Sequence, residues 1–239
     1  MSKTNTKELI EKAWKLFDKK DFESSADTFS EVLDVDENNQ DALYGKACSS
    51  FRLLDYDNAE KDLNKLLKLD PAHANALHTR ALIKGIDENF ESAIKDLNKL
   101  IEIDPENAEA YLDLGSTYLT IEEYNLAADC FDKLVDLHKN CPQGWCGKGL
   151  SALYKKELKK AIEYFNLAIK TESNYLLAIL ARADAYMEMG KKSEAQKDIK
   201  KALNIKPDVF SEFKNEEDED DNEDEILDDG EIEEFDLDD

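Results

Sequence analysis

The sequence predicts an all-α protein built as an open array of repeated helix pairs, a helical solenoid. The chain repeats itself at a fixed step, so that Asp70-Pro71 falls on Asp104-Pro105 when the sequence is shifted by 34 residues. The stretch 74–105 contains two helical patterns separated by a polar break at 87–89. The 8 Gly and 4 Pro of the 239 residues are too few for a β-rich chain with many turns.

Residues 6–209 divide at this step into consecutive units without insertion or deletion. The six units are 6–39, 40–73, 74–107, 108–141, 142–175 and 176–209. Each unit has a break between its two helical patterns, and a short break makes the two helices antiparallel. We expect these breaks near residues 19–21, 54–56, 88–90, 122–124, 156–158 and 190–192.

Four columns of the aligned units explain how each helix pair packs. Small residues allow two helices to approach closely, and large apolar residues at steps of three and four form a buried stripe. The eighth residues are small: Ala13, Ala47, Ala81, Gly115, Gly149 and Ala183. The twentieth are small too: Ser25, Ala59, Ala93, Ala127, Ala161 and Ala195. The stripe on the second helix consists of Phe29, Leu63, Leu97, Phe131, Phe165 and Ile199, with Val32, Leu66, Leu100, Leu134, Ala168 and Ala202.

On these columns the unit resembles the tetratricopeptide repeat, and the resemblance covers residues 6–209. Ser50 and Lys84 depart from the large apolar residue that this family prefers at the eleventh position, and Lys192 replaces an aromatic residue. The resemblance implies a right-handed superhelix whose first helices line a concave groove that binds partner peptides or helices. We therefore expect an N-terminal arm (1–5), the array (6–209), the start of a capping helix (210–214) and an acidic tail (215–239).

The resemblance also indicates which residues line the groove, namely those at six positions of each first helix. The candidate partner-binding residues are Trp14, Phe17, Tyr44, Phe51, Leu82, Ile86, Leu112, Leu119, Leu150 and Tyr154. Trp14 either faces this groove or packs against the next unit. The charged groove positions are Lys7 and Arg52 against seven acids: Glu11, Asp18, Asp41, Glu109, Asp113, Asp184 and Glu188. The basic clamp with which some relatives bind the C-terminal carboxylate of heat-shock chaperones is absent.

Unit five begins with an unusual run, CPQGWCGKG at 141–149. Gly149 belongs to the small-residue column, but Gly144 and Gly147 do not, and each helical glycine costs about 1 kcal/mol relative to alanine. This helix is therefore either a loosened joint or a place where a ligand approaches the backbone. Trp145 lies at an apolar position of the unit, and we expect it in the core.

The chain shows no signature of catalysis or of a bound cofactor. Cys130, His138, Cys141 and Cys146 lie within 17 residues, but the first two are about 12 Å apart on the expected helix, so we expect no zinc site. P-loop, dinucleotide-binding and His-Glu-x-x-His motifs are missing. The cysteines show no disulfide framework and the N-terminus no signal peptide, which favours the cytoplasm. Without a long apolar run or a concentrated basic face, we expect neither a membrane nor a direct nucleic-acid partner.

The charge changes abruptly after Lys214. Residues 211–239 hold 18 acidic residues and one Lys, so they carry −17 of the net charge of −25. Such composition predicts a disordered, extended tail. Its Asp/Gly run fails as a calcium loop because Leu227 stands where an oxygen ligand is required. The acidic groove should repel this tail, which we expect to stay free in the isolated protein.

Together these features indicate a non-catalytic interaction scaffold or adaptor without a cofactor. Its expected partner is a peptide or helix, basic or amphipathic, bound in the apolar and acidic groove. The alternative is a chaperone or decoy for basic, nucleic-acid-binding proteins, acting through the acidic tail. The sequence specifies no oligomeric state.

Overall fold

The computed structural model describes residues 3–208 and consists there of α-helices without a strand. The helices are α1 (Lys3–Asp18), α2 (Phe22–Leu33), α3 (Gln40–Arg52), α4 (Tyr56–Leu69), α5 (Ala74–Ile86), α6 (Phe90–Ile103), α7 (Ala108–Thr120), α8 (Tyr124–Leu137), α9 (Pro142–Tyr154), α10 (Leu158–Thr171), α11 (Leu176–Glu188) and α12 (Lys192–Ile205). Helix α1 begins at Lys3 and so takes in residues 3–5 of the expected arm. The expected capping helix and acidic tail lie outside the described residues.

The breaks within the pairs lie close to where the repeat predicts them. The first is at 19–21, as expected, and the other five begin one residue earlier than expected, at 53–55, 87–89, 121–123, 155–157 and 189–191. The reason is that residues such as Tyr56 and Phe90 already belong to the second helix, whose N-cap is the Asp or Asn before them. The all-α prediction is confirmed.

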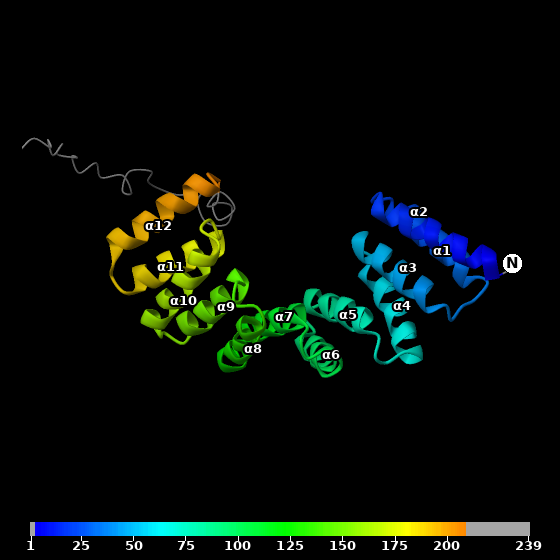
Figure 1. Cartoon of the computed structure of the whole chain (residues 1–239), viewed down its shortest axis with the longest axis horizontal. Coiled ribbons are helices and arrows are strands. Elements are labelled where there is room, and N and C mark those ends of the chain that lie inside the picture. Colours follow the sequence, from blue (N-terminus) through cyan, green and yellow to red (C-terminus); the bar gives the residue numbers. More distant parts are fainter. Residues whose placement is uncertain (1–2, 209–239) are drawn as a thin grey trace, which may run out of the picture.

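The helices follow one another along an open arc (Figure 1). Each helix packs on the next along the chain, and first helices of successive pairs also touch, except that α5 and α7 approach less closely than the others. In the middle of the arc α5 and α7 lie on its inner side, and α6 and α8 on its outer side. The array is therefore most open between α5 and α7.

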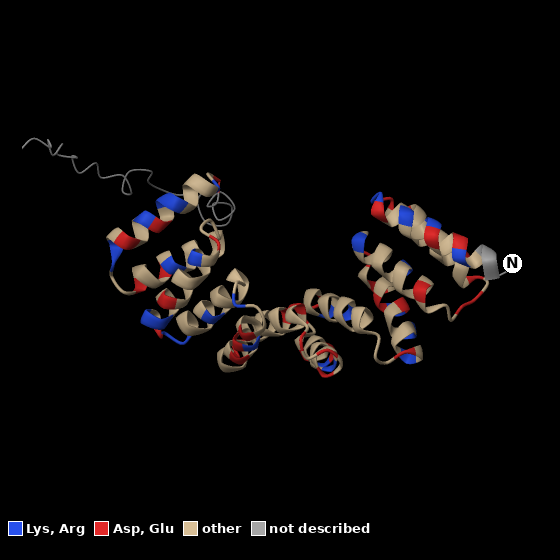
Figure 2. Cartoon of the chain, viewed as in Figure 1, with Lys and Arg blue, Asp and Glu red and all other residues tan. Residues whose placement is uncertain are grey.

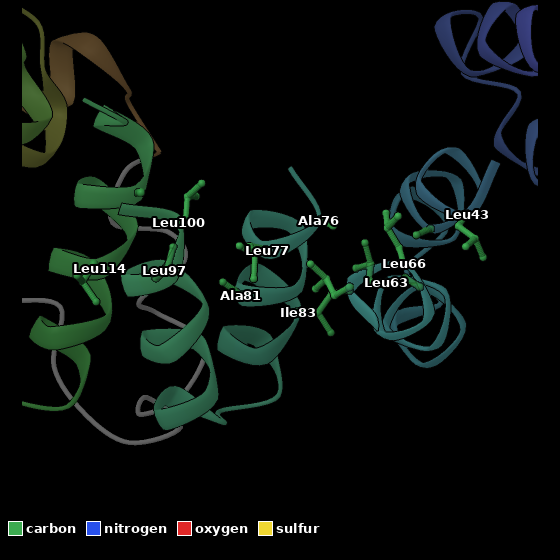
Figure 3. Close-up of a cluster of buried hydrophobic side chains, with 14 of the residues drawn as sticks. Leu43, Leu63, Leu66, Ala76, Leu77, Ala81, Ile83, Leu97, Leu100 and Leu114 are labelled. Carbon is green, nitrogen blue, oxygen red and sulfur yellow. The ribbon is translucent and has the colours of Figure 1, made fainter. Parts of the chain in front are cut away.

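The core consists of clusters of buried apolar residues inside and between the pairs, and Figure 3 shows the cluster that extends from α3 to α8. All twelve residues of the two small columns are buried, and Ser25 Oγ donates to the Ala13 carbonyl at 3.0 Å, which places the two columns in direct contact. The apolar stripe is buried too, with the exception of the half-buried Ile199 on the last helix. The four columns thus explain why the helices pair as they do.

Charged clamps that the columns do not reveal join neighbouring helices. Arg80 Nε and Nη2 donate to the two carboxylate oxygens of Asp96 at 2.7 Å, and Nη1 donates to Asn64 Oδ1 at 2.8 Å. Arg182, Asp198 and Asn166 repeat this arrangement between α10, α11 and α12. In each clamp the guanidinium donates two charge-assisted hydrogen bonds to a buried carboxylate, which is the strong geometry for such a pair. At the corresponding places of α7 and α8 stand Leu114 and Cys130.

The glycines of α9 are sites of tight packing, and this corrects both interpretations made from the sequence. A Cβ on Gly147 would lie 2.5 Å from the Phe131 ring, and one on Gly149 2.3 Å from the Phe165 ring. A Cβ on Gly144 would lie 2.7 Å from Val135. These glycines admit large side chains of α8 and α10, so α9 is neither a loose joint nor open to a ligand at these positions.

Trp145 is only half-buried, which differs from the expected core position. Its ring stacks on Tyr164 with centroids 6.3 Å apart, and Lys148 Nζ lies 5.0 Å from the Trp145 centroid. The indole Nε1–H donates to the Lys139 carbonyl at 3.0 Å. Because an indole has a polar end, the ring covers the core edge while its N–H reaches the turn before α9.

Candidate functional site

The ten candidate groove residues all lie on first helices of the pairs, from α1 to α9, and none is fully buried. Ile86 and Tyr154 are the most accessible of them, each 50% exposed. Leu112 and Leu119 pack partly against the core around Phe131, and Leu150 against the core around Phe165. The other seven lie at separate places along the array, so the candidate residues do not form one pocket.

The first place is an aromatic cluster between α1 and α3. The Trp14 ring lies 5.5 Å from Phe17, 5.2 Å from Phe29 and 6.3 Å from Tyr44. Burial raises the pKa of Tyr44 above its ordinary value, with a further contribution from the neighbouring Cys48. Trp14 therefore packs against the next pair and stays half-exposed at the same time.

The second place is at the α7–α8 and α9–α10 turns. Tyr154, the last residue of α9, stacks on Tyr124 at 5.3 Å with an interplanar angle of 25°. Phe51 forms a similar contact with Tyr56, at 5.6 Å. In both cases a residue at the end of a first helix lies against an aromatic residue at the start of a second helix, which is a packing role.

The third place, in the middle of the array, is a surface notch between α5, α6 and α7 with a volume of about 290 Å³. We call it the central notch. It is lined by Ala81, Leu82, Gly85, Ile86, Phe90, Leu97, Asp113, Ser116, Thr117 and Thr120. A Cβ on Gly85 would meet nothing within 4 Å. Apolar side chains on α5 thus face hydroxyls and a carboxylate on α7 across an accessible gap.

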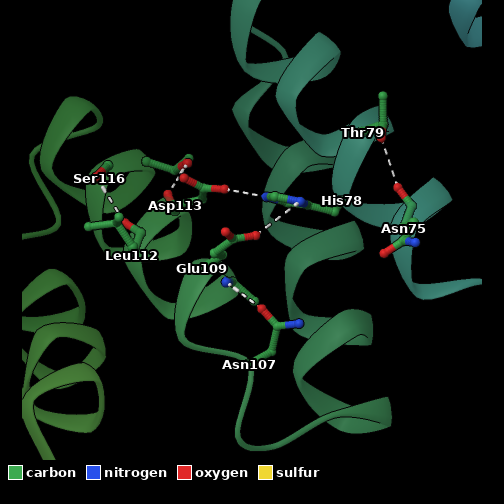
Figure 4. A network of polar contacts seen from close by, with 10 residues as sticks. Asn75, His78, Thr79, Asn107, Glu109, Leu112, Asp113 and Ser116 are labelled. Atoms are coloured by element: carbon green, nitrogen blue, oxygen red, sulfur yellow. Dashed lines mark hydrogen bonds and ion pairs between the residues drawn. The ribbon is translucent and has the colours of Figure 1, made fainter. Parts of the chain in front are cut away.

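A histidine that the sequence did not single out ties the two sides together near the notch (Figure 4). His78 Nε2 lies 2.6 Å from Asp113 Oδ2, and Nδ1 lies 4.0 Å from Glu109 Oε2. The hydrogen bond that His78 donates to Asp113 raises the pKa of His78 above its ordinary value of 6.5, against an opposing effect of burial. His78 and Asp113 stand at the fifth and sixth positions of successive units, a relation that could have been found in the alignment.

The cysteine and histidine cluster has no geometry for a metal. Within residues 3–208 no group of three or more His, Cys, Asp or Glu side chains could hold an ion. Cys130 and Cys146 are buried, and burial raises the pKa of each thiol to about 12. A thiol with such a pKa stays protonated at neutral pH, so it is a poor nucleophile and a poor ligand. These two cysteines act as small apolar core residues.

A second depression, the N-terminal hollow, has a mixed apolar and charged lining. It lies between the start of α1 and the start of α3 and has a volume of about 720 Å³. Ile10 and Val35 provide the apolar lining, and Lys7, Glu11 and Asp41 stand among its charged residues. Three of the predicted charged groove residues are therefore together here.

None of the helices in the described part is long and apolar enough to span a bilayer.

Comparison with known protein families matches three profiles, all of them for the tetratricopeptide repeat. A profile described as TPR repeat matches residues 88–122, one described as tetratricopeptide repeat matches 112–175, and another with this description matches 40–73 and 178–209. Curated protein sequences give no match.

Several solved structures are similar to the chain. MamA is 26% identical, with a TM-score of 0.63 over 73% of this chain and 95% of that one. A tetratricopeptide repeat protein from Parabacteroides merdae is 23% identical, with a TM-score of 0.76 over 84% of this chain and 80% of that one. YrrB, described as a TPR protein with an unusual peptide-binding site, is 19% identical, with a TM-score of 0.63 over 77% and 95%.

Proposed function

Because the chain belongs to the tetratricopeptide repeat family, we propose that it is a non-catalytic scaffold that binds a protein partner in its groove. We define the groove as the face formed by the first helices of the pairs. The central notch is the observation that carries this proposal. It is a gap of about 290 Å³ with the half-exposed Ile86 at its edge, in the part of the array where first helices are furthest apart.

The lining of the notch indicates the chemistry of the partner. Leu82, Ile86 and Phe90 offer contacts to an apolar side chain, while Asp113 and the nearby Glu109 favour a cation. An amphipathic helix or extended segment with apolar and basic residues provides both. We propose such a segment as the partner. A cytoplasmic location is part of the same proposal, and it is supported by the four free cysteines.

A second candidate function rests on charge alone. Residues 211–239 carry a net charge of −17, which suits a chaperone or decoy for basic proteins. Removing the segment after Lys214 separates the two candidates. The groove proposal expects binding of a basic amphipathic peptide to persist, whereas the chaperone proposal expects it to be lost.

The notch can be tested with a single substitution and a matched control. Ile86→Ser removes an apolar side chain from the notch without changing charge. Ile103→Ser removes an exposed isoleucine, 41% exposed, from the end of α6. The probe is a fluorescent amphipathic peptide composed of Leu and Lys only, and binding is measured by anisotropy.

We expect Ile86→Ser to weaken peptide binding at least about tenfold, because burying this side chain contributes about 1.5–3 kcal/mol. Ile103→Ser should leave the affinity unchanged. Added salt should weaken binding to the unsubstituted chain. Equal affinities of both variants, or equal binding of a Leu/Glu peptide, would refute the proposal.

A further inference from the structure

The sign of the charge changes along the array, and Figure 2 shows this change. Residues 3–141 contain 17 Lys and Arg against 30 Asp and Glu, whereas residues 142–208 contain 13 against 8. The last four described helices, α9 to α12, are thus the net basic part of an otherwise acidic protein. They directly precede the acidic segment 215–239, which contains 17 acidic residues and no Lys or Arg.

Part of this positive charge is concentrated on one edge, at the α9–α10 and α11–α12 turns (Figure 2). We call this edge the basic surface and define it by six exposed lysines: Lys155, Lys156, Lys159, Lys160, Lys191 and Lys192. The two turns lie side by side, because Lys156 Nζ is 2.8 Å from Glu188 Oε1 at the end of α11. The corresponding turns in the middle of the array are acidic, with Asp87-Glu88 and Glu122-Glu123.

Ion pairs neutralise only part of the basic surface. Glu157 pairs with Lys155 at 3.4 Å and with Lys160 at 2.6 Å, and Glu188 pairs with Lys156. Lys159 and Lys192 have no ion pair with any residue between 3 and 208. The surface therefore retains a surplus of accessible positive charge that is suited to a polyanion. This corrects the expectation from the sequence that the chain lacks a concentrated basic face.

We propose that the acidic segment 215–239 binds the basic surface of its own chain. Charge complementarity supports this, since the segment has 17 negative charges and α9–α12 are the part of the array that attracts them. Distance permits it as well. Helix α12 is about 21 Å long, which fewer than ten extended residues cover, and the basic surface includes its first turn.

Tethering favours binding within the molecule, because joining two binding partners in one chain by a short connection raises their effective concentration, up to about the millimolar range. The acidic residues of the groove repel the same segment, so the groove stays open. The expectation from the sequence that the tail stays free considered the groove alone. The basic surface gives the segment a different place to bind.

Backbone amide NMR spectra test the proposal on the full chain and on a chain ending at Lys214. We expect chemical shift differences at 155–160 and 191–192 that disappear in 500 mM NaCl. A synthetic peptide of residues 215–239, added to the shorter chain, should restore them. Differences at Tyr44 and Leu82 instead, or no differences at all, would overturn the proposal.

Charge reversal with a matched control identifies the surface. Lys159→Glu/Lys192→Glu changes two lysines without ion pairs, so it breaks no pair between described residues. Lys95→Glu/Lys133→Glu makes the same charge change on exposed residues of α6 and α8. We expect the first variant to raise the Kd of the peptide for the shorter chain at least tenfold, and the control to raise it less than threefold. Equal effects would mean that only net charge matters, and the assigned surface would be wrong.

Discussion

Helices α5 and α9 occupy the same place in their pairs, yet they pack in opposite ways. Gly85 of α5 lies beside the central notch, where an added Cβ would meet nothing within 4 Å, whereas Gly147 of α9 lies against the Phe131 ring. Arg80 of α5 clamps a buried aspartate, whereas its counterpart Lys148 pairs with Asp132, whose side chain is 53% exposed. Helices in the same place of their pairs can therefore pack openly, as α5 does beside the notch, or tightly, as α9 does.

The largest effect should come from removing the α5 clamp. Arg80→Leu leaves Asp96 buried without its cation, and we expect it to lower the free energy of unfolding by about 3 kcal/mol. Lys148→Leu should cost about 1 kcal/mol or less, because Asp132 can turn to water. Chemical denaturation of both variants measures the difference.

A double substitution provides the control for this prediction. Arg80→Leu/Asp96→Cys copies the Leu114 and Cys130 found at α7 and α8, and it should restore most of the lost stability. If the double variant is as unstable as Arg80→Leu alone, an unpaired aspartate is not the cause.

The two glycines should respond with opposite signs to the same substitution. Gly147→Ala should destabilise the protein by about 1–3 kcal/mol through overpacking against Phe131. Gly85→Ala should stabilise it by about 0.5–1 kcal/mol, because alanine is the better helix former and space is available. Thermal unfolding checks both signs. Adding Phe131→Leu to Gly147→Ala should recover part of the loss, and a lack of recovery would contradict the contact.

The contact between α5 and α7 should contribute a pH-dependent amount to stability. The pKa of His78 is raised in the folded protein, so the interaction with Asp113 contributes fully below about pH 6.5 and is lost as the pH rises through the raised value. We expect the stability difference between the unsubstituted chain and His78→Gln to be up to about 1 kcal/mol at pH 5.5 and to decline by pH 8.5. Denaturation curves across this range measure it. A difference that grows with pH would disprove the assignment.

The smallest effect should come from the turns that follow α5 and α9. Glu88 and Lys156 have positive φ angles of 56° and 61°, a left-handed conformation that costs a non-glycine residue about 1–2 kcal/mol. Glu88→Gly should relieve this cost but increase the conformational entropy of the unfolded chain, for a net stabilisation of about 0.5 kcal/mol. Lys156→Gly should gain slightly less, because its pair with Glu188 is lost. A loss of stability at both positions would contradict this account.

The sequence alone predicted the helices and their packing columns because these depend on residue types that recur at every step. It did not predict that Phe131 packs against Gly147 or that Arg80 binds Asp96, because these contacts depend on pairs of residues from different helices. One numerical relation links them. Gly147 and Phe131, Arg80 and Asp96, and Lys148 and Asp132 are all separated by 16 residues. Searching the sequence at that offset would have found all three contacts.

The candidate groove was predictable only in part. The repeat positions place Leu82 and Ile86 on α5, and both line the central notch. The width of the notch was not predictable, because it depends on how far α5 and α7 lie apart. The role of Gly144 and Gly147 was misjudged because helix propensity alone treats a glycine as a weakness, whereas packing can require it.

The 16-residue offset also bears on how the protein is made. Contacts of this kind join only helices that follow one another, and even the His78–Asp113 hydrogen bond spans just 35 residues. Low contact order permits rapid folding, since little loop entropy must be lost before a contact forms. Each helix pair can therefore dock on the preceding one as soon as it leaves the ribosome, so that the array grows in the direction of synthesis.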